Sequence, residues 1–179
     1  IRLDRVKAAT ATGGMVCAKP ATTGTEFYVD VAFPGGYTVN ATAANWTVTT
    51  TNLPGGNTAW AGITTATTVS GNTVTFRSND LNVGSIYCFN FSGTNTLTTG
   101  TAGDSQLSTI TTRTTTPTTL DSSVQALSII SNDQVVVSAT VSPIFSFALS
   151  VTTLNLRPVA LIIKKASSAT LLVIVFAVR

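Results

Sequence analysis

The chain has 179 residues, of which 9% are charged and 44% hydrophobic, and its formal net charge is +3. It contains no histidine, and Glu26 is its only glutamate. Few groups are therefore available for proton transfer or metal ligation, and no basic cluster is dense enough for a nucleic-acid surface, so we predict a structural or binding protein that is not an enzyme, uses no cofactor and binds no nucleic acid.

The first half of the chain has the alternation that is typical of β-strands. Apolar residues recur at every second position in the segments 27–33, 46–50 and 73–77. Turn sequences rich in glycine, proline, serine and asparagine follow or precede them, at 34–36 and 70–72 for example. Such runs predict an antiparallel sandwich or barrel. No segment has the periodicity of an amphipathic helix of ten or more residues, and we predict an all-β protein.

Residues 81–91 predict a glycine turn that leads into a further strand, with Tyr87 and Phe89 on one face. This order of leucine, glycine and alternating aromatic residues resembles the late strand of immunoglobulin-like and fibronectin-type-III-like sandwiches. The resemblance covers about residues 1–92. It implies an immunoglobulin-like β-sandwich, which we place at residues 1–100.

The two cysteines, Cys17 and Cys88, have no CxxC spacing, and no histidine completes a zinc site. They form either a disulfide or two buried free thiols. We favour the disulfide, because low charge and abundant threonine are typical of extracellular proteins. It would close a loop of about 70 residues and stabilise the fold by roughly 4 kcal/mol. Cys17 follows a Gly13-Gly14 turn, so we expect the bridge to hold the N-terminal segment across a sheet face rather than to span the core.

Threonine, glycine, serine and asparagine dominate the next part of the chain. We predict a threonine-rich linker over residues 101–118, in which 107–112 has the pattern of one short strand. Alternation resumes beyond it, as in 145–151, and predicts a second β-sandwich over residues 119–179. That length holds about five strands, fewer than the seven of an immunoglobulin-like sandwich, so this second unit is predicted to be incomplete.

The chain ends in a run that is apolar on both faces of a strand, so both faces must be hidden. The run consists of Leu171, Leu172, Val173, Ile174, Val175, Phe176, Ala177 and Val178. Only about 13 residues follow Lys165 before the last arginine, short of the roughly 20 that a transmembrane helix needs, and we predict no membrane span. The run is then either a central strand of the chain's own second sheet or a strand donated to a neighbouring subunit. The segment 1–9 is the alternative donor, although its four charges suit burial poorly.

The phrase at 132–141 resembles strands of secreted bacterial or archaeal surface proteins of the pilin- or fimbria-like kind. The start at Ile1, without a methionine, is interpreted as a mature chain whose export signal has been removed. We therefore predict an extracellular, cell-surface subunit of a filament, pilus-like fibre or surface layer, whose partners are copies of itself and which assembles by β-strand complementation. An adhesin or carbohydrate-binding module that holds glycans, and a viral capsid-type β protein, stay open as alternatives.

Two further sets of residues have alternative interpretations. Asn40, Asn45 and Asn90 each begin an Asn-x-Ser/Thr sequon and are either glycosylation sites or ordinary strand and turn residues. Trp46 and Trp60 are either buried core residues, which we favour, or a platform on which sugars stack.

Overall fold

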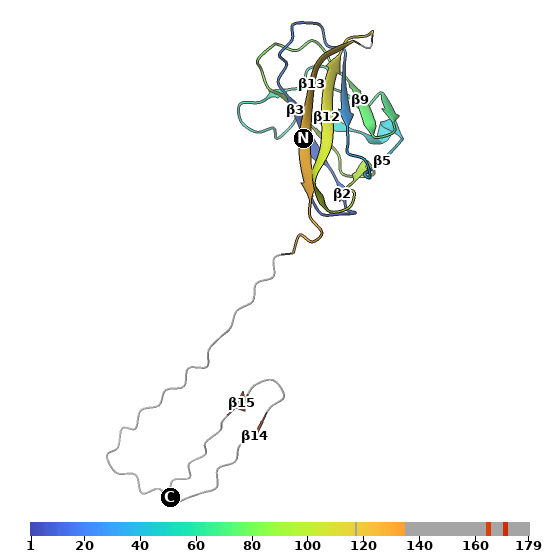
Figure 1. Cartoon of the computed structure of the whole chain (residues 1–179). Coiled ribbons are helices and arrows are strands. Elements are labelled where there is room, and N and C mark those ends of the chain that lie inside the picture. The colour runs from blue at the N-terminus through green and yellow to red at the C-terminus, as the bar shows by residue number, and fades with distance from the viewer. Residues whose placement is uncertain (117, 135–163, 166–169, 172–179) are drawn as a thin grey trace, which may run out of the picture. The chain divides into compact units, whose positions relative to one another are not determined.

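A computed structural model describes residues 1–116 and 118–134, together with the two short strands β14 (Lys164–Lys165) and β15 (Thr170–Leu171) (Figure 1). The chain divides into two compact units, Ile1–Val136 and Val137–Arg179. The described part of the first unit consists of β-strands, loops and one short 3-10 helix at Ala43–Asn45, with no α-helix. The prediction of an all-β protein is confirmed.

Three sheets make up the first unit, and all their pairs are antiparallel except the pair of β7 with β10. The first sheet has the order β1 (Arg2–Leu3), β3 (Gly14–Ala18), β10 (Tyr87–Phe91) and β6 (Val48–Thr49), with β7 (Thr58–Ala59) also paired to β10. The second sheet has the order β13 (Thr119–Ile129), β12 (Gly103–Arg113), β4 (Tyr28–Ala32), β9 (Thr73–Arg77) and β8 (Thr68–Ser70). The small third sheet has the order β2 (Ala11–Thr12), β11 (Leu97–Thr98) and β5 (Thr38–Val39).

The alternation in the sequence correctly predicted β4, the central strand of the second sheet. In β4, Val29 and Val31 are fully buried, whereas Tyr28, Asp30 and Ala32, which alternate with them, are partly exposed. Strand β9 returns from β8 through a tight turn in which Gly71 has a φ of +55°, a conformation that glycine adopts without strain. The segment expected at 46–50 is shorter than predicted, since only β6 within it pairs as a strand.

Aromatic side chains from both sheets meet in one core. Phe76 of β9 lies 5.1 Å from Phe89 of β10, measured between ring centroids. Trp46 packs on Phe91 at 5.6 Å, and Trp60 on Phe89 at 5.5 Å. Because full burial of one large apolar side chain is worth roughly 1.5–3 kcal/mol, this cluster holds the first and second sheets against each other.

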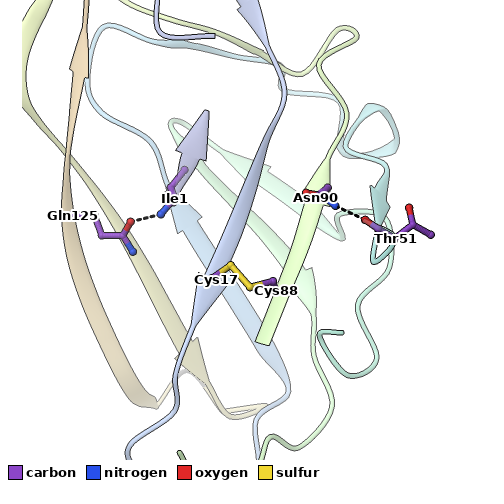
Figure 2. Close-up of a disulfide and its surroundings, with 6 residues drawn as sticks. All are labelled: Ile1, Cys17, Thr51, Cys88, Asn90 and Gln125. Atoms are coloured by element: carbon purple, nitrogen blue, oxygen red, sulfur yellow. Dashed lines mark hydrogen bonds between the residues drawn. A yellow bond between two sulfur atoms is a disulfide. The ribbon is translucent and has the colours of Figure 1, made fainter. Parts of the chain in front are cut away.

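Cys17 and Cys88 form a disulfide, as predicted. They are register partners on the neighbouring strands β3 and β10, with their Cα atoms 4.2 Å apart (Figure 2). The bridge therefore joins two adjacent strands of one sheet. It does not span the core, as expected, but it links paired strands instead of holding a segment across a sheet face.

The linker predicted over 101–118 is wrong for most of its length. Strand β12 pairs with β4 on one side and with β13 on the other, and Figure 1 shows β12 and β13 running alongside each other. Its inward residues Ile110 and Thr112 are each 2% exposed. Threonine-rich sequence was misleading here because threonine also has high β-propensity. Strands β12 and β13 belong to the first unit, which extends past the expected limit at residue 100 and takes in the start of the expected second unit.

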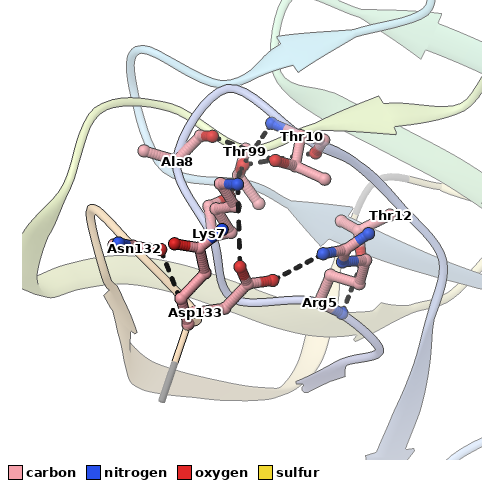
Figure 3. A network of polar contacts seen from close by, with 9 residues as sticks. Arg5, Lys7, Ala8, Thr10, Thr12, Thr99, Asn132 and Asp133 are labelled. Atoms are coloured by element: carbon pink, nitrogen blue, oxygen red, sulfur yellow. Dashed lines mark hydrogen bonds and ion pairs between the residues drawn. The ribbon is translucent and has the colours of Figure 1, made fainter. Parts of the chain in front are cut away.

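The N-terminal segment pairs within its own unit, and its role as an alternative donor strand stays a prediction. Strand β1 pairs with β3, and Leu3 is 7% exposed. The backbone at Lys7 then forms a parallel bridge with Ile130. Asp133 makes ion pairs with Arg5 and with Lys7, the latter at 3.6 Å (Figure 3).

The second unit is described only at its two short strands. Strands β14 and β15 are antiparallel, with Lys164 opposite Leu171. Residues 172–178 of the apolar run lie outside the described residues, as does most of the predicted second sandwich. Both stay predictions.

Candidate functional site

Groups that could carry catalysis or metal binding are sparse in the first unit. Within residues 1–116 and 118–134, no three histidine, cysteine, aspartate or glutamate side chains gather as a metal site would need. No helix among the described residues has the length and apolar character to cross a membrane. The remaining candidates are buried polar groups and the edges of the sheets.

The most deeply buried acid is Glu26, with 1% of its surface exposed. Its Oε2 accepts a hydrogen bond of 3.0 Å from the backbone N–H of Leu81, while Oε1 has no hydrogen-bond partner. Burial raises the pKa of this carboxyl, and the bond from Leu81 opposes that shift in part. Asp80 raises the pKa further. Sequence reasoning missed this burial, because a single glutamate between Thr25 and Phe27 has no distinguishing pattern.

Trp46 and Trp60 do not form a sugar-binding platform, since they are 0% and 2% exposed. Each indole N–H is satisfied inside the protein. That of Trp46 donates to the carbonyl of Asn40 at 2.9 Å, and that of Trp60 donates to the hydroxyl of Ser78 at 2.8 Å. The preferred core interpretation is confirmed.

The three sequon asparagines are all partly exposed. The amide oxygen of Asn40 accepts a bond of 2.8 Å from the N–H of Thr42. The amide nitrogen of Asn90, to which a glycan would be attached, donates to the carbonyl of Thr51 at 2.9 Å (Figure 2). Glycosylation at Asn40, Asn45 and Asn90 stays a prediction.

A groove with a volume of about 300 Å³ lies at the side of the first unit. We call it the edge groove. It lies between the end of β3 in the first sheet and strands β12 and β13 in the second. Its lining includes Cys17, Ala18, Pro20, Ile110, Asp121 and Ser123.

The edge groove begins where the pairing of β1 ends. Strand β1 pairs with β3 only at Gly14 and Met15. Among the described residues, positions 16–18 of β3 therefore have no strand partner on the side opposite β10. The side chain of Gln125 accepts a hydrogen bond from the amino group of Ile1 at this point (Figure 2).

The other wall is the outer edge of β13, which is 11 residues long. Strand β13 pairs with β12 on its inner side. In the part of the chain that the structure describes, no strand pairs with its outer side, and the backbone bonds to Val6 and Ala8 begin only at Ile130. Such an edge presents unpaired N–H and C=O groups to any strand that approaches.

Asp121 shapes the groove from within β13. Its carboxylate accepts bonds from the backbone N–H groups of Ala21 and Thr22, at 3.1 and 3.2 Å, and from the Thr22 hydroxyl at 2.8 Å. Partial burial raises the pKa of this carboxyl, but the bonds from Thr22 and Ala21 outweigh that effect, and its pKa is lowered. Asp121 thus holds the loop after β3 against the second sheet.

An apolar patch lies on the outer face of the same two strands. Leu107 of β12 and Val124 of β13 are each 61% exposed. In the register of the pair, Leu107 lies opposite Ala126 and Val124 lies opposite Thr109, so all four share one face. We call Leu107, Val124 and Ala126 the outer patch.

Comparisons with protein-family models, with curated proteins and with solved structures found no match to this chain. The edge groove and the outer patch are thus interpreted from their geometry alone. Neither was found by sequence reasoning, which assigned β12 to a linker. The one sequence signal was the alternation of Ser108, Ile110 and Thr112, whose side chains face inward.

Proposed function

We propose that this protein is a structural subunit of an extracellular filament, pilus-like fibre or surface layer, and that copies assemble by β-strand complementation. In this proposal, the first unit is a rigid immunoglobulin-like sandwich and the C-terminal apolar run is the strand that one subunit gives to the next. The observation that carries the proposal is the long outer edge of β13, which has no strand partner among the described residues.

The N-terminal segment cannot be the donated strand without leaving its own sheet, because β1 pairs with β3 and Leu3 is buried. The run at 171–178 contains no charged or polar side chain, and both faces of such a strand need cover. A strand that pairs with a second copy satisfies both this need and that of the β13 edge.

The disulfide supports a location outside the cell, since such bonds persist in oxidising compartments. The small number of charges and the threonine-rich surface agree with that location. The carbohydrate-binding alternative depended on Trp46 and Trp60, and both side chains are buried in the core. A viral capsid-type protein would share the assembly mechanism and would form closed shells instead of fibres.

The test introduces two charges into the apolar run of the full chain, as Ile174→Asp with Phe176→Asp. We expect this variant to stay monomeric in light scattering and to show no assemblies in negative-stain electron microscopy, because a buried unpaired charge is costly. The matched control, Ser167→Asp with Ser168→Asp, adds the same charges just outside the run and should assemble normally. Assembly of the first variant at the same concentration as the unmodified chain would refute the proposed function.

A further inference from the structure

We propose that the edge groove and the outer edge of β13 form the acceptor site for the run 171–178 of a second copy. The run would join the second sheet as a new edge strand next to β13. This inference rests on the proposed function and adds to it the place at which the donated strand binds.

The position of the groove argues for a strand as its occupant. The groove follows directly from the end of β1 along β3, and it separates the unpaired positions 16–18 of β3 from the outer edge of β13. Two open strand edges thus flank one hollow. Backbone groups at such edges bind an extended chain through main-chain hydrogen bonds, while the hollow between them receives its side chains.

The two sides of β13 explain why the occupant must be apolar on both faces. A strand added to β13 directs alternate side chains to opposite faces of the sheet. One set enters the edge groove, whose floor includes the buried residue Ile110. The other set lies beside the outer patch, where Leu107 and Val124 are each 61% exposed. The run 171–178 supplies apolar residues in both sets.

Length and volume agree with this occupant. An eight-residue strand extends over about 26 Å at roughly 3.3 Å per residue. Strand β13 has 11 residues, and the side chains of Asp121 and Gln125 on it are bonded to Ala21, Thr22 and Ile1. The groove volume of about 300 Å³ compares with roughly 30 Å³ for one water molecule. The groove therefore has room for several side-chain groups of the run.

Ser123, which lines the groove from β13, is the position for a direct test. The full chain carries a photoreactive benzoylphenylalanine at Ser123, and unlabelled and nitrogen-15-labelled copies are mixed before assembly and irradiation. Mass spectrometry then identifies the crosslinked peptides. We expect crosslinks that join position 123 of one isotopic form to residues 171–178 of the other. The same group at Ser70, on the exposed opposite edge of the second sheet, should not give this crosslink.

A second variant tests the site without the bulky photoreactive side chain, which could itself disturb assembly. Ser123→Asp places a short charged side chain in the groove, which cannot extend back to water as a lysine would. We expect at least a tenfold rise in the concentration needed for assembly, with unchanged thermal unfolding of the monomer. Ser70→Asp adds the same charge at the opposite edge and should leave assembly unchanged.

The outcomes separate this inference from the proposed function. In one outcome, assembly depends on the run 171–178 while position 123 crosslinks to other residues and Ser123→Asp has no effect. That outcome would support the proposed function and overturn the acceptor site. Crosslinks within a single copy would overturn it as well, since the run would then fill its own groove. Failure of the full chain to assemble under any condition would remove both proposals.

Discussion

At the scale of single residues, two carboxyl groups in the first unit have opposite environments. Glu26 is buried with one oxygen unpaired, whereas Asp121 is held by three hydrogen bonds at the groove. Their pKa values move in opposite directions, which makes their effects on stability separable by pH.

The raised pKa of Glu26 means that the folded protein binds its proton more tightly than the unfolded chain does. The stabilisation is complete below the ordinary glutamate pKa and is lost as pH rises through the higher pKa of the folded state. We predict that, as pH rises from the ordinary glutamate pKa to the higher pKa of the folded state, the free energy of unfolding will fall less in Glu26→Gln than in the unmodified protein. Urea unfolding at successive pH values measures this difference. An unchanged pH profile would contradict the burial of this group.

The lowered pKa of Asp121 has the reverse consequence. Its contribution is present above the ordinary aspartate pKa and is lost as pH falls through the lower pKa of the folded state. We predict that Asp121→Asn will lower the free energy of unfolding at neutral pH by about 1 kcal/mol. This loss is smaller than that expected for a fully buried hydrogen bond to a charged group, because solvent screens this site. The exposed Asp104→Asn is the control in the same urea titration, and an equal loss in both variants would contradict the role of Asp121.

At the scale of elements, close contact between β1 and β3 depends on Gly14. A Cβ atom there would lie 2.5 Å from the carbonyl oxygen of Arg2 and 2.9 Å from the ring of Phe91. We predict that Gly14→Ala will destabilise the protein by about 1–3 kcal/mol, the usual cost of overpacking, as measured by thermal unfolding. Gly35→Ala, where a Cβ meets no atom within 4 Å, should have a much smaller effect, and similar losses would show that β1 does not pack as described.

The elements also show what sequence patterns could and could not predict. Alternation in β4 predicted the strand and its buried face correctly, because Val29 and Val31 follow a period of two. In β9 it predicted the strand, but Thr75 is buried together with Val74 and Phe76. It was misleading in β12, where threonine forms both linkers and strands and only the pairing with β4 decides between them. The edge groove could not be predicted, since it arises where β1 stops short along β3, a matter of tertiary register.

At the scale of the whole molecule, the first unit combines a disulfide-bridged sheet, an aromatic core and an outer edge of β13 with which no described strand pairs. An open edge of this kind is an aggregation hazard unless it is covered. In the proposed assembly, a neighbouring copy covers this edge with its apolar run. If this proposal holds, a chain without the apolar run is expected to stay monomeric, and a chain with it is expected to assemble.

The most direct measurement of this claim is an electron cryo-microscopy map of the assembled full chain. We predict continuous density for one added strand along the outer edge of β13, with side chains that match residues 171–178 of an adjacent subunit. A map in which subunits touch through other surfaces while the β13 edge faces solvent, or a preparation that contains only dispersed monomers, would contradict the account.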